Sequence, residues 1–282
     1  MQPMKKVWTV TIAAALLLTA CGQKTTNEGG AGATASPAPT AEASAAPGGL
    51  QMDKLVLGTS ADYAPYEFHK KIDGKDQIVG FDIEIAKEIA KDLGAELEIS
   101  DSDFDGLLLA LNGGKVDLVI SGMTPTEERK QNVDFSKIYY KAEQGVIVKK
   151  GEEGSYGSLD DLKGKKIGVQ KGSIQEGIAK EVEGAKLTSL AKIPELILEL
   201  TSGRVDALIV EKPVADQYVK TQDSIALADV KIEQSEEEAG SAIAIKKGNQ
   251  ELLDAVNKTI DRLQASGDID RFVVEANELV GE

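Results

Sequence analysis

The chain has 282 residues, a formal net charge of −15, one cysteine and one histidine. The acidic balance argues against a nucleic-acid partner and against docking on anionic lipid through the folded surface, since both require a basic face. With Cys21 as the single cysteine, an intrachain disulfide and a cysteine-based zinc site are excluded. With His69 as the single histidine, a His-rich metal site is excluded, and Ser-His-Asp catalysis has one candidate base.

The first twenty residues have the layout of a secretory signal. Lys5 and Lys6 form a short positive segment, and the apolar run of residues 7–20 carries no charge. That run is too short for a membrane-spanning helix, which needs about 20 residues. It ends in LTAC, which matches the bacterial lipobox, where the cysteine becomes the lipid-carrying N-terminus. We predict a lipoprotein signal peptide over residues 1–20 and lipidation of Cys21; the alternative is a cleaved signal with an incidental cysteine.

Residues 22–49 consist mainly of Ala, Gly, Pro, Thr and Ser. Such a segment cannot bury enough apolar surface to offset the entropy cost of ordering it. We therefore predict that residues 21–49 form a lipid-anchored flexible linker. The remaining stretch, residues 50–282, is long enough for two lobes of ordinary size.

Strand and helix patterns then alternate along the chain. Residues 55–57 read as a short strand, and residues 81–93 have apolar side chains at helical spacing. Gly94 follows that helix as a typical stop signal, and residues 97–99 read as the next strand. This order predicts an α/β fold with parallel strands and crossover helices.

An internal repeat indicates two similar lobes. Residues 107–120 read LLLALNGGKVDLVI, and residues 196–210 read LILELTSGRVDALIV. In both, an apolar helix ends at a Gly turn, followed by a basic residue, Val, Asp and an apolar strand; the alternative is chance recurrence of a common α/β unit. Two equivalent lobes would face each other through their strand ends, where open α/β sheets bind ligands. The segments expected there are Ser60–Tyr63, Ser121–Thr124, Gln170–Ile174 and Glu211.

The chain from Lys54 onward resembles the family 3 extracellular solute-binding proteins of amino-acid ABC importers. The matching stretches occur in the family's order and span essentially all of this part. They are GTSADYAPYEF (58–68), GFDIEIAKEIAKDLG (80–94), FDGLLLALNGGKVDLVISGMTPTEERKQNVDFS (104–136), KGKKIGVQKGS (163–173) and GRVDALIVEKPVA (203–215).

The resemblance implies a periplasmic-binding-protein-like fold of type II, in which two α/β lobes are joined by a two-strand hinge. Lobe 1 is then expected to comprise residues 50–142 and 238–282, and lobe 2 residues 143–237, with crossings near 140–145 and 235–241. The implied function is capture of a polar amino acid between closing lobes and delivery to an ABC importer permease. The protein would act as a monomer outside the cytoplasm, lipid-anchored to the cell membrane.

Several positions correspond to the family's contacts with the ligand α-carboxylate. Arg129 corresponds to the arginine that grips this group, because its planar fork suits a carboxylate bidentately. Thr124 corresponds to the hydroxyl and backbone N–H that share the carboxylate. Ser173 and Ile174 are expected to offer backbone N–H groups from lobe 2, in a turn before a helix.

Other positions correspond to contacts with the α-ammonium and the side chain. Glu211 stands where an acidic residue pairs with the ammonium, and Ser121 and Gly122 would supply carbonyl groups near it. Tyr63 and Phe104 correspond to aromatic walls that sandwich the ligand side chain.

Ligand identity is expected to depend on Gln170, which stands where the family varies with ligand. Some relatives for basic amino acids have Asp where this chain has Ser60, and that acid helps bind the distal cation. Asp62 lies nearby, and we include both Ser60 and Asp62 in the expected site. The missing acid disfavours arginine or lysine and favours an uncharged ligand such as glutamine, with histidine also open.

Each role has a simpler structural alternative. Arg129 lies in a polar helix start, where a lone arginine is usually solvated, and Glu211 could be a loop acid. Tyr63 and Phe104 could be core aromatic residues. We expect His69 to be a surface residue.

Residues 101–106 mimic the opening of a calcium loop, D-x-D-x-D-G. An EF-hand needs a bidentate Glu at its twelfth position, which here is Asn112. We therefore expect no calcium site there, and no metal or cofactor elsewhere.

Two other functions stay open. A few relatives on the same fold are dehydratases of prephenate-like acids, for which Glu211 is the one tempting general acid. A surface adhesin or a sensor could also keep the fold. We expect a binding protein rather than an enzyme.

Overall fold

A computed structural model describes residues 50–236 and 238–281. These residues belong to one compact unit. The predicted signal peptide, Cys21 and the linker of residues 21–49 lie outside the described residues. Within the described ranges, no helix is both long enough and apolar enough to cross a membrane.

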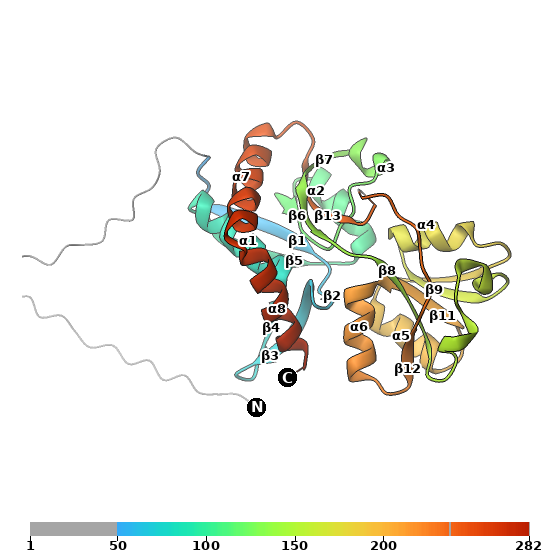
Figure 1. Cartoon of the computed structure of the whole chain (residues 1–282). Coiled ribbons are helices and arrows are strands. Elements are labelled where there is room, and N and C mark those ends of the chain that lie inside the picture. The colour runs from blue at the N-terminus through green and yellow to red at the C-terminus, as the bar shows by residue number, and fades with distance from the viewer. Residues whose placement is uncertain (1–49, 237, 282) are drawn as a thin grey trace, which may run out of the picture. The chain divides into compact units, whose positions relative to one another are not determined.

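The first of two five-stranded sheets has the strand order β5-β1-β6-β13-β7 (Figure 1). Strand β1 pairs parallel with β5 and β6, whereas β13 pairs antiparallel with β6 and β7. The strands are β1 Lys54–Thr59, β5 Glu96–Asp101, β6 Leu118–Val119, β7 Val133–Lys141 and β13 Gly240–Lys246.

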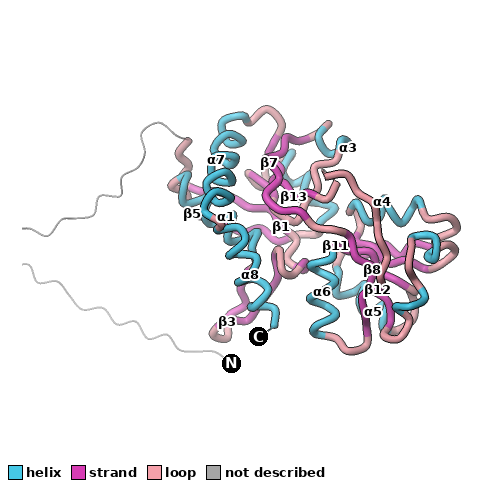
Figure 2. The backbone as a smooth tube through the Cα atoms, viewed as in Figure 1, coloured by secondary structure: helices cyan, strands magenta, loops and turns pink. Residues whose placement is uncertain are grey.

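Helices and a small three-stranded sheet complete what we call lobe 1. In Figure 2, α1, α7 and α8 lie together along one side, in agreement with their mutual contacts. The helical elements are α1 Phe81–Leu93, η1 Phe104–Gly106, α2 Leu107–Asn112, α3 Glu127–Lys130, α7 Gln250–Ser266 and α8 Asp268–Gly281. The small sheet, of order β2-β3-β4, comprises β2 Asp62–Tyr63, β3 Glu67–Ile72 and β4 Lys75–Val79.

The second sheet, in lobe 2, has the order β10-β9-β11-β8-β12. Its strands are β8 Gln144–Lys149, β9 Lys166–Gln170, β10 Lys186–Leu190, β11 Ala207–Glu211 and β12 Ile225–Ala228. Its helices are η2 Glu153–Ser155, η3 Leu159–Leu162, α4 Ile174–Glu181, α5 Ile193–Thr201 and α6 Lys212–Thr221.

The two lobes repeat the same local structure, which confirms the internal repeat. The Asp117 carboxylate accepts a 2.8 Å hydrogen bond from Val56 N, and Asp117 N donates to Val56 O at 2.8 Å. In lobe 2, the Asp206 carboxylate accepts a hydrogen bond from Lys166 N, and Asp206 N donates to Lys166 O, both at 2.8 Å. The repeated aspartate therefore ties the start of its own strand to the neighbouring parallel strand.

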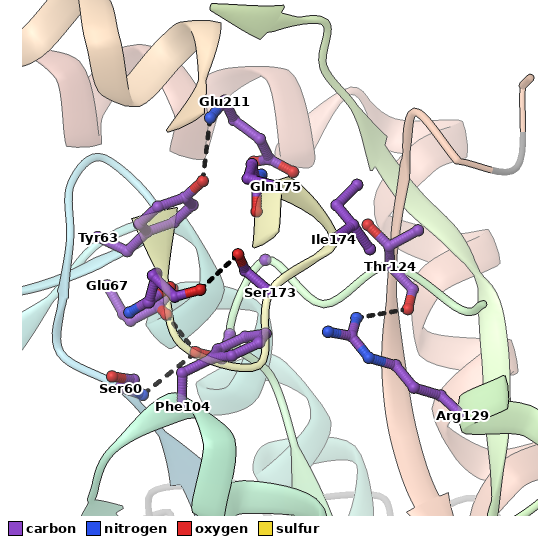
Figure 3. Close-up of a pocket in the computed structure, with 13 residues that line it drawn as sticks. Ser60, Tyr63, Glu67, Phe104, Thr124, Arg129, Ser173, Ile174, Gln175 and Glu211 are labelled. Carbon is purple, nitrogen blue, oxygen red and sulfur yellow. Dashed lines mark hydrogen bonds between the residues drawn. The ribbon is translucent and has the colours of Figure 1, made fainter. Parts of the chain in front are cut away.

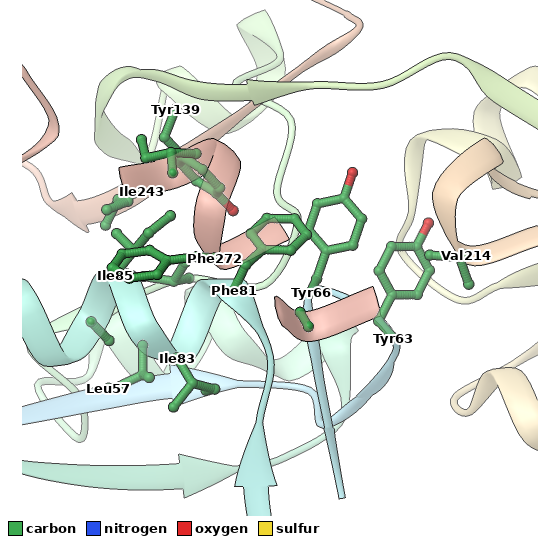
Figure 4. Packing of buried hydrophobic residues seen from close by; sticks show 14 of the residues in the cluster. Leu57, Tyr63, Tyr66, Phe81, Ile83, Ile85, Tyr139, Val214, Ile243 and Phe272 are labelled. Atoms are coloured by element: carbon green, nitrogen blue, oxygen red, sulfur yellow. The ribbon is translucent and has the colours of Figure 1, made fainter. Parts of the chain in front are cut away.

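The core explains why residues 81–93 form a helix in lobe 1. Ile85, Ile89 and Leu93 are buried on one face, and Gly94 ends the helix with φ 67°, a left-handed conformation that suits glycine. Fully burying a side chain of this size contributes about 1.5–3 kcal/mol. Beside them, the rings of Tyr66 and Phe81 are 4.4 Å apart, between centroids, and extend the core toward lobe 2 (Figure 4).

The chain crosses between the sheets twice, and the crossings lie side by side. It leaves β7 at Lys141 and enters β8 at Gln144, and it returns before β13. Ala142 N donates to Ala239 O at 2.8 Å, so the outgoing and returning segments are hydrogen-bonded to each other. This is the two-strand connection expected for the type II fold, whose two α/β lobes the structure confirms. The lobe boundaries themselves, at residues 142 and 238, stay a prediction.

Candidate functional site

A pocket lies between the two lobes, where strand ends of both sheets meet. Ser60 follows β1 and Ser121 follows β6, whereas Gln170 and Glu211 end β9 and β11. The full lining is Ser60, Tyr63, Glu67, Phe104, Ser121, Gly122, Thr124, Arg129, Gln170, Ser173, Ile174, Gln175 and Glu211. The equivalent ends of the repeated strands therefore surround a single cavity.

Eleven of the twelve residues expected from the sequence line this pocket. The exception is Asp62, whose carboxylate accepts hydrogen bonds from Ile193 N at 2.7 Å and Ser60 Oγ at 3.0 Å. Asp62 thus joins lobe 1 to the start of α5 in lobe 2. Two lining residues, Glu67 and Gln175, were not anticipated. The contacts of all these residues with a ligand stay predictions.

Arg129 is held at the pocket by both lobes. Thr126 caps the short helix α3 by accepting a hydrogen bond from Arg129 N at 3.3 Å. The guanidinium donates to Thr124 O at 2.8 Å and to Gly172 O of lobe 2 at 3.0 Å, and it lies 5.3 Å from the Phe104 ring centroid. Burial lowers the pKa of Arg129 to about 10, so this side chain remains a cation at neutral pH.

Glu211 is a buried acid at the end of β11, with 3% of its surface exposed. Its backbone N–H donates to the Tyr63 hydroxyl of lobe 1 at 3.1 Å (Figure 3). Burial raises the pKa of Glu211 to about 8, Asp82 adds to this rise, and Tyr66 and Arg129 oppose it. Its Oε2 has no hydrogen-bond partner among the described residues. This carboxyl group is suited to a cation that enters the pocket.

A second buried acid, Glu67, lines the lobe 1 wall beside Ser60. Ser60 N donates to Ser121 Oγ at 3.2 Å, and that hydroxyl donates to Glu67 Oε1 at 2.5 Å. Burial and the neighbouring Asp82 raise the pKa of Glu67 well above its usual range. The sequence contains a signal for this position, since a glutamate stands among apolar residues in APYEF of the first matching stretch.

The backbone donors expected from lobe 2 are already partly engaged. Ser173 N donates to Gln170 O at 3.2 Å, while the Ser173 hydroxyl donates to the same oxygen at 2.7 Å and caps α4 by accepting from Glu176 N. Both Ser173 and Ile174 nevertheless line the pocket.

Further polar contacts at the rim of the pocket join the two lobes. Lys192 Nζ lies 3.5 Å from the carboxylate of Asp103, 3.9 Å from that of Asp101 and 3.4 Å from Ser60 Oγ. Lys171 Nζ lies 2.8 Å from the carboxylate of Asp105. The acids of the calcium-like motif thus face lysines of lobe 2. In the part of the chain that the structure describes, no cluster of three or more His, Cys, Asp or Glu could hold a metal.

His69 lies away from the pocket lining, as an exposed residue of β3. Its ring nitrogens contact the carboxylates of Asp76 at 2.8 Å and Asp101 at 3.2 Å. A hydrogen bond with Asp101 raises the pKa of His69. This position offers no histidine base to the pocket, which matches the surface role expected for His69.

Comparisons with known proteins agree with this architecture. Residues 55–275 match the family model of bacterial extracellular solute-binding proteins, family 3. The arginine-binding extracellular protein ArtP of Bacillus subtilis (strain 168) is 45% identical over 225 residues, covering 78% of this chain and 84% of that protein.

Two solved structures have the same fold. The amino acid ABC transporter substrate-binding protein AbpA of Streptococcus pneumoniae, bound to L-arginine, is 46% identical with a TM-score of 0.79, over 81% of this chain and 96% of that one. The ancestral amino acid-binding protein AncCDT-1, a precursor of cyclohexadienyl dehydratase, is 38% identical with a TM-score of 0.71, over 79% and 94%. The present chain belongs to family 3 of the bacterial extracellular solute-binding proteins.

Proposed function

We propose that the protein captures an amino acid with a positively charged side chain, of the arginine class, and delivers it to an ABC importer permease. Family membership supports an amino-acid ligand outside the cytoplasm. ArtP, named for arginine binding, and AbpA, bound to L-arginine, support this class of ligand in particular.

The observation that carries this choice is the Glu67 carboxyl group in the pocket wall. An amino acid zwitterion pairs its α-carboxylate with Arg129 and its α-ammonium with Glu211. Glu67 then remains as a further acid, and a buried carboxylate needs a cationic or hydrogen-bonding partner. In Figure 3, Arg129 and Thr124 lie on one side of the pocket and Glu67, Ser60 and Tyr63 on the other. A ligand that spans these sides presents its side chain to Glu67.

This argument reverses the preference drawn from Ser60 alone. The acid that some relatives carry at the position of Ser60 is missing, which favoured glutamine. Glu67 supplies a carboxyl group from the start of β3, connected to Ser60 through the Ser121 hydroxyl. The pocket therefore has an acid for a distal cation at Glu67, in the same stretch as Ser60.

Binding rather than turnover is the second part of the proposal. The likeness to a dehydratase precursor makes this a question that needs a test. Elimination requires a general acid aimed at the leaving group. We assign Glu211, the candidate, to pairing with the α-ammonium instead. Incubation with prephenate-like acids should give no product, and product formation that Glu211→Gln abolishes would contradict this part.

Anchoring through lipid on Cys21 is the third part, supported by the lipobox sequence. The anchor and the linker of residues 21–49 would hold a monomeric binding unit, lobe 1 with residues 50–142 and 238–282 and lobe 2 with residues 143–237, at the outer face of the cell membrane. We expect Cys21→Ser to be exported and to leave the membrane fraction. Retention of the variant in washed membranes would exclude the lipid as the anchor.

The test of ligand class is a thermal-shift and calorimetric screen of the standard amino acids, with citrulline added. Citrulline has the shape of arginine and an uncharged urea group. We expect arginine to bind more tightly than citrulline, and Glu67→Gln to remove most of that preference while glutamine binding survives. Equal affinity for arginine and citrulline in the parent protein would overturn the assignment to a basic amino acid.

A further inference from the structure

Glu67 and Asp82 form a pair of buried carboxyl groups under the lobe 1 wall of the pocket. Glu67 begins β3 and Asp82 lies in the first turn of α1, and neither side chain is exposed. Glu67 accepts from the Ser121 hydroxyl, while Asp82 Oδ2 accepts from Gly122 N and from the Tyr139 hydroxyl, both at 2.9 Å. Each group thus has one oxygen bound to a neighbour that borders or supports the pocket.

The second carboxyl oxygen of each acid lacks a hydrogen-bond partner among the described residues. Glu67 Oε2 and Asp82 Oδ1 have no further hydrogen-bond partner within the described ranges. Burial raises the pKa of both groups, that of Asp82 to about 6; their mutual interaction raises the pKa of Glu67 further and opposes the rise at Asp82. One proton held between them would satisfy both oxygens, because a carboxylic acid donates one hydrogen bond to its neighbour.

Among the described residues, the main groups acting on the pair are acids and neutral donors, not cations. Two further acids add negative charge: Asp62 of β2 interacts with Glu67, and Glu211 of β11 interacts with Asp82. The phenol of Tyr139 on β7 is neutral, since burial holds its pKa well above the usual range. Arg129 of α3, the cation among the described residues that line the pocket, interacts with Glu128 and Glu211. Two neighbouring buried carboxylates without a cation cannot both ionise.

We propose that Glu67 and Asp82 share one proton and that the side-chain cation of a bound amino acid displaces it. The inference rests on the proposed function, because it needs a ligand whose charge reaches Glu67. The O–H bond of the pair breaks, the proton passes to solvent, and the ligand cation takes over the charge balance. No other bond changes. The pair therefore exchanges one positive charge for another.

The exchange makes the pocket tolerant of two ligand classes. An uncharged side chain leaves the proton in place, so no unpaired buried charge results. A cationic side chain gains an ionised partner at the cost of removing the proton. Preference for the cation should rise with pH, because a higher pH favours release of the proton. The Glu67–Asp82 pair is thus the element that sets specificity by charge.

Isothermal titration calorimetry in buffers of different ionisation enthalpy measures protons released on binding. We expect arginine to release more protons than citrulline near pH 7, by an amount that approaches about one per site where the pair is protonated. Ionisation of Glu211 by the α-ammonium is common to both ligands and cancels in the difference. The comparison needs no variant, so a failure to fold cannot obscure it.

Two variants assign the difference to the pair. Glu67→Gln should abolish the excess proton release with arginine. Asp82→Asn should reduce it, because Glu67 without its acidic neighbour ionises more readily; circular dichroism melting reports whether each variant folds. Equal release for arginine and citrulline, with both bound by the parent protein, would overturn the shared proton. No binding of arginine would instead contradict the proposed function.

Discussion

Lys192 at the start of α5 contacts lobe 1 across the pocket rim, and its removal should shorten ligand residence. Two carboxylates, of Asp103 and Asp101, lie 3.5 and 3.9 Å from its Nζ, and its side chain is 29% exposed. A partly exposed ion pair contributes roughly 0.2–1 kcal/mol, and Lys192 has two, of which the longer is the weaker; Lys192→Gln should therefore destabilise the closed form by about 0.5–1.5 kcal/mol. That corresponds to an affinity loss of roughly 2- to 12-fold.

The kinetics distinguish a closure contact from a general effect. Ligand first meets open lobes, so the association rate should change little while the dissociation rate rises by most of this factor. Stopped-flow displacement of bound ligand measures the dissociation rate, and added salt should reduce the difference in this rate between variant and parent. Lys54→Gln is the matched control, because Lys54 contacts Glu98 at 2.8 Å within the lobe 1 sheet. Unchanged dissociation for Lys192→Gln, or an equal change in the control, would refute the reasoning.

Three further predictions concern the pocket. Arg129→Ala should weaken binding by about 2–5 kcal/mol, because a buried ligand charge loses its partner; near-normal calorimetric affinity in a folded variant would exclude the clamp. The pKa of Glu211 is raised to about 8, and its ionised form pairs with the ammonium, so affinity for citrulline, which has no side-chain cation, should rise with pH toward about 8 and this slope should vanish in Glu211→Gln. Gly172→Ala should hinder closure, since Gly172 has φ 76° and a Cβ there would lie 2.9 Å from Asp105 Cβ. If ligand decreased the radius of gyration of Gly172→Ala as much as that of the parent protein, the predicted effect on closure would be contradicted.

The internal repeat could be recognised in the sequence because the same residues make the same local contacts in both lobes. The aspartate of each unit hydrogen-bonds the start of the neighbouring parallel strand, at Val56 in lobe 1 and Lys166 in lobe 2. The helix of residues 81–93 was equally clear, since its apolar spacing and Gly94 agree. Such features depend on residues close in sequence.

The polar strands of the small three-stranded sheet were not predicted from the sequence. Strands β3 and β4 pair through EFHKKI and KDQIV, where exposed charged residues obscure the alternation of apolar side chains. Their pairing depends on the intervening turn, in which Asp73 and Gly74 both have positive φ. Without this small sheet, the position of Glu67 relative to the pocket could not be inferred from spacing.

Asp62 and Glu67 show more clearly what could not be predicted from the sequence, namely the direction of a side chain. Both belong to the same matching stretch, yet Asp62 turns to the N–H of Ile193 and Glu67 lines the pocket. The difference arises from a partner 131 residues away for Asp62 and from Ser121, 54 residues away, for Glu67. Side-chain direction at a lobe interface therefore depends on long-range contacts that a local pattern does not contain.

A crystal structure of the protein with L-arginine tests the central claim most directly. We expect lobes closed over one arginine, with its α-carboxylate on Arg129, its α-ammonium beside Glu211 and its guanidinium within hydrogen-bond distance of Glu67. A guanidinium directed away from Glu67, or an α-carboxylate that does not contact Arg129, would contradict the proposed recognition of a basic amino acid.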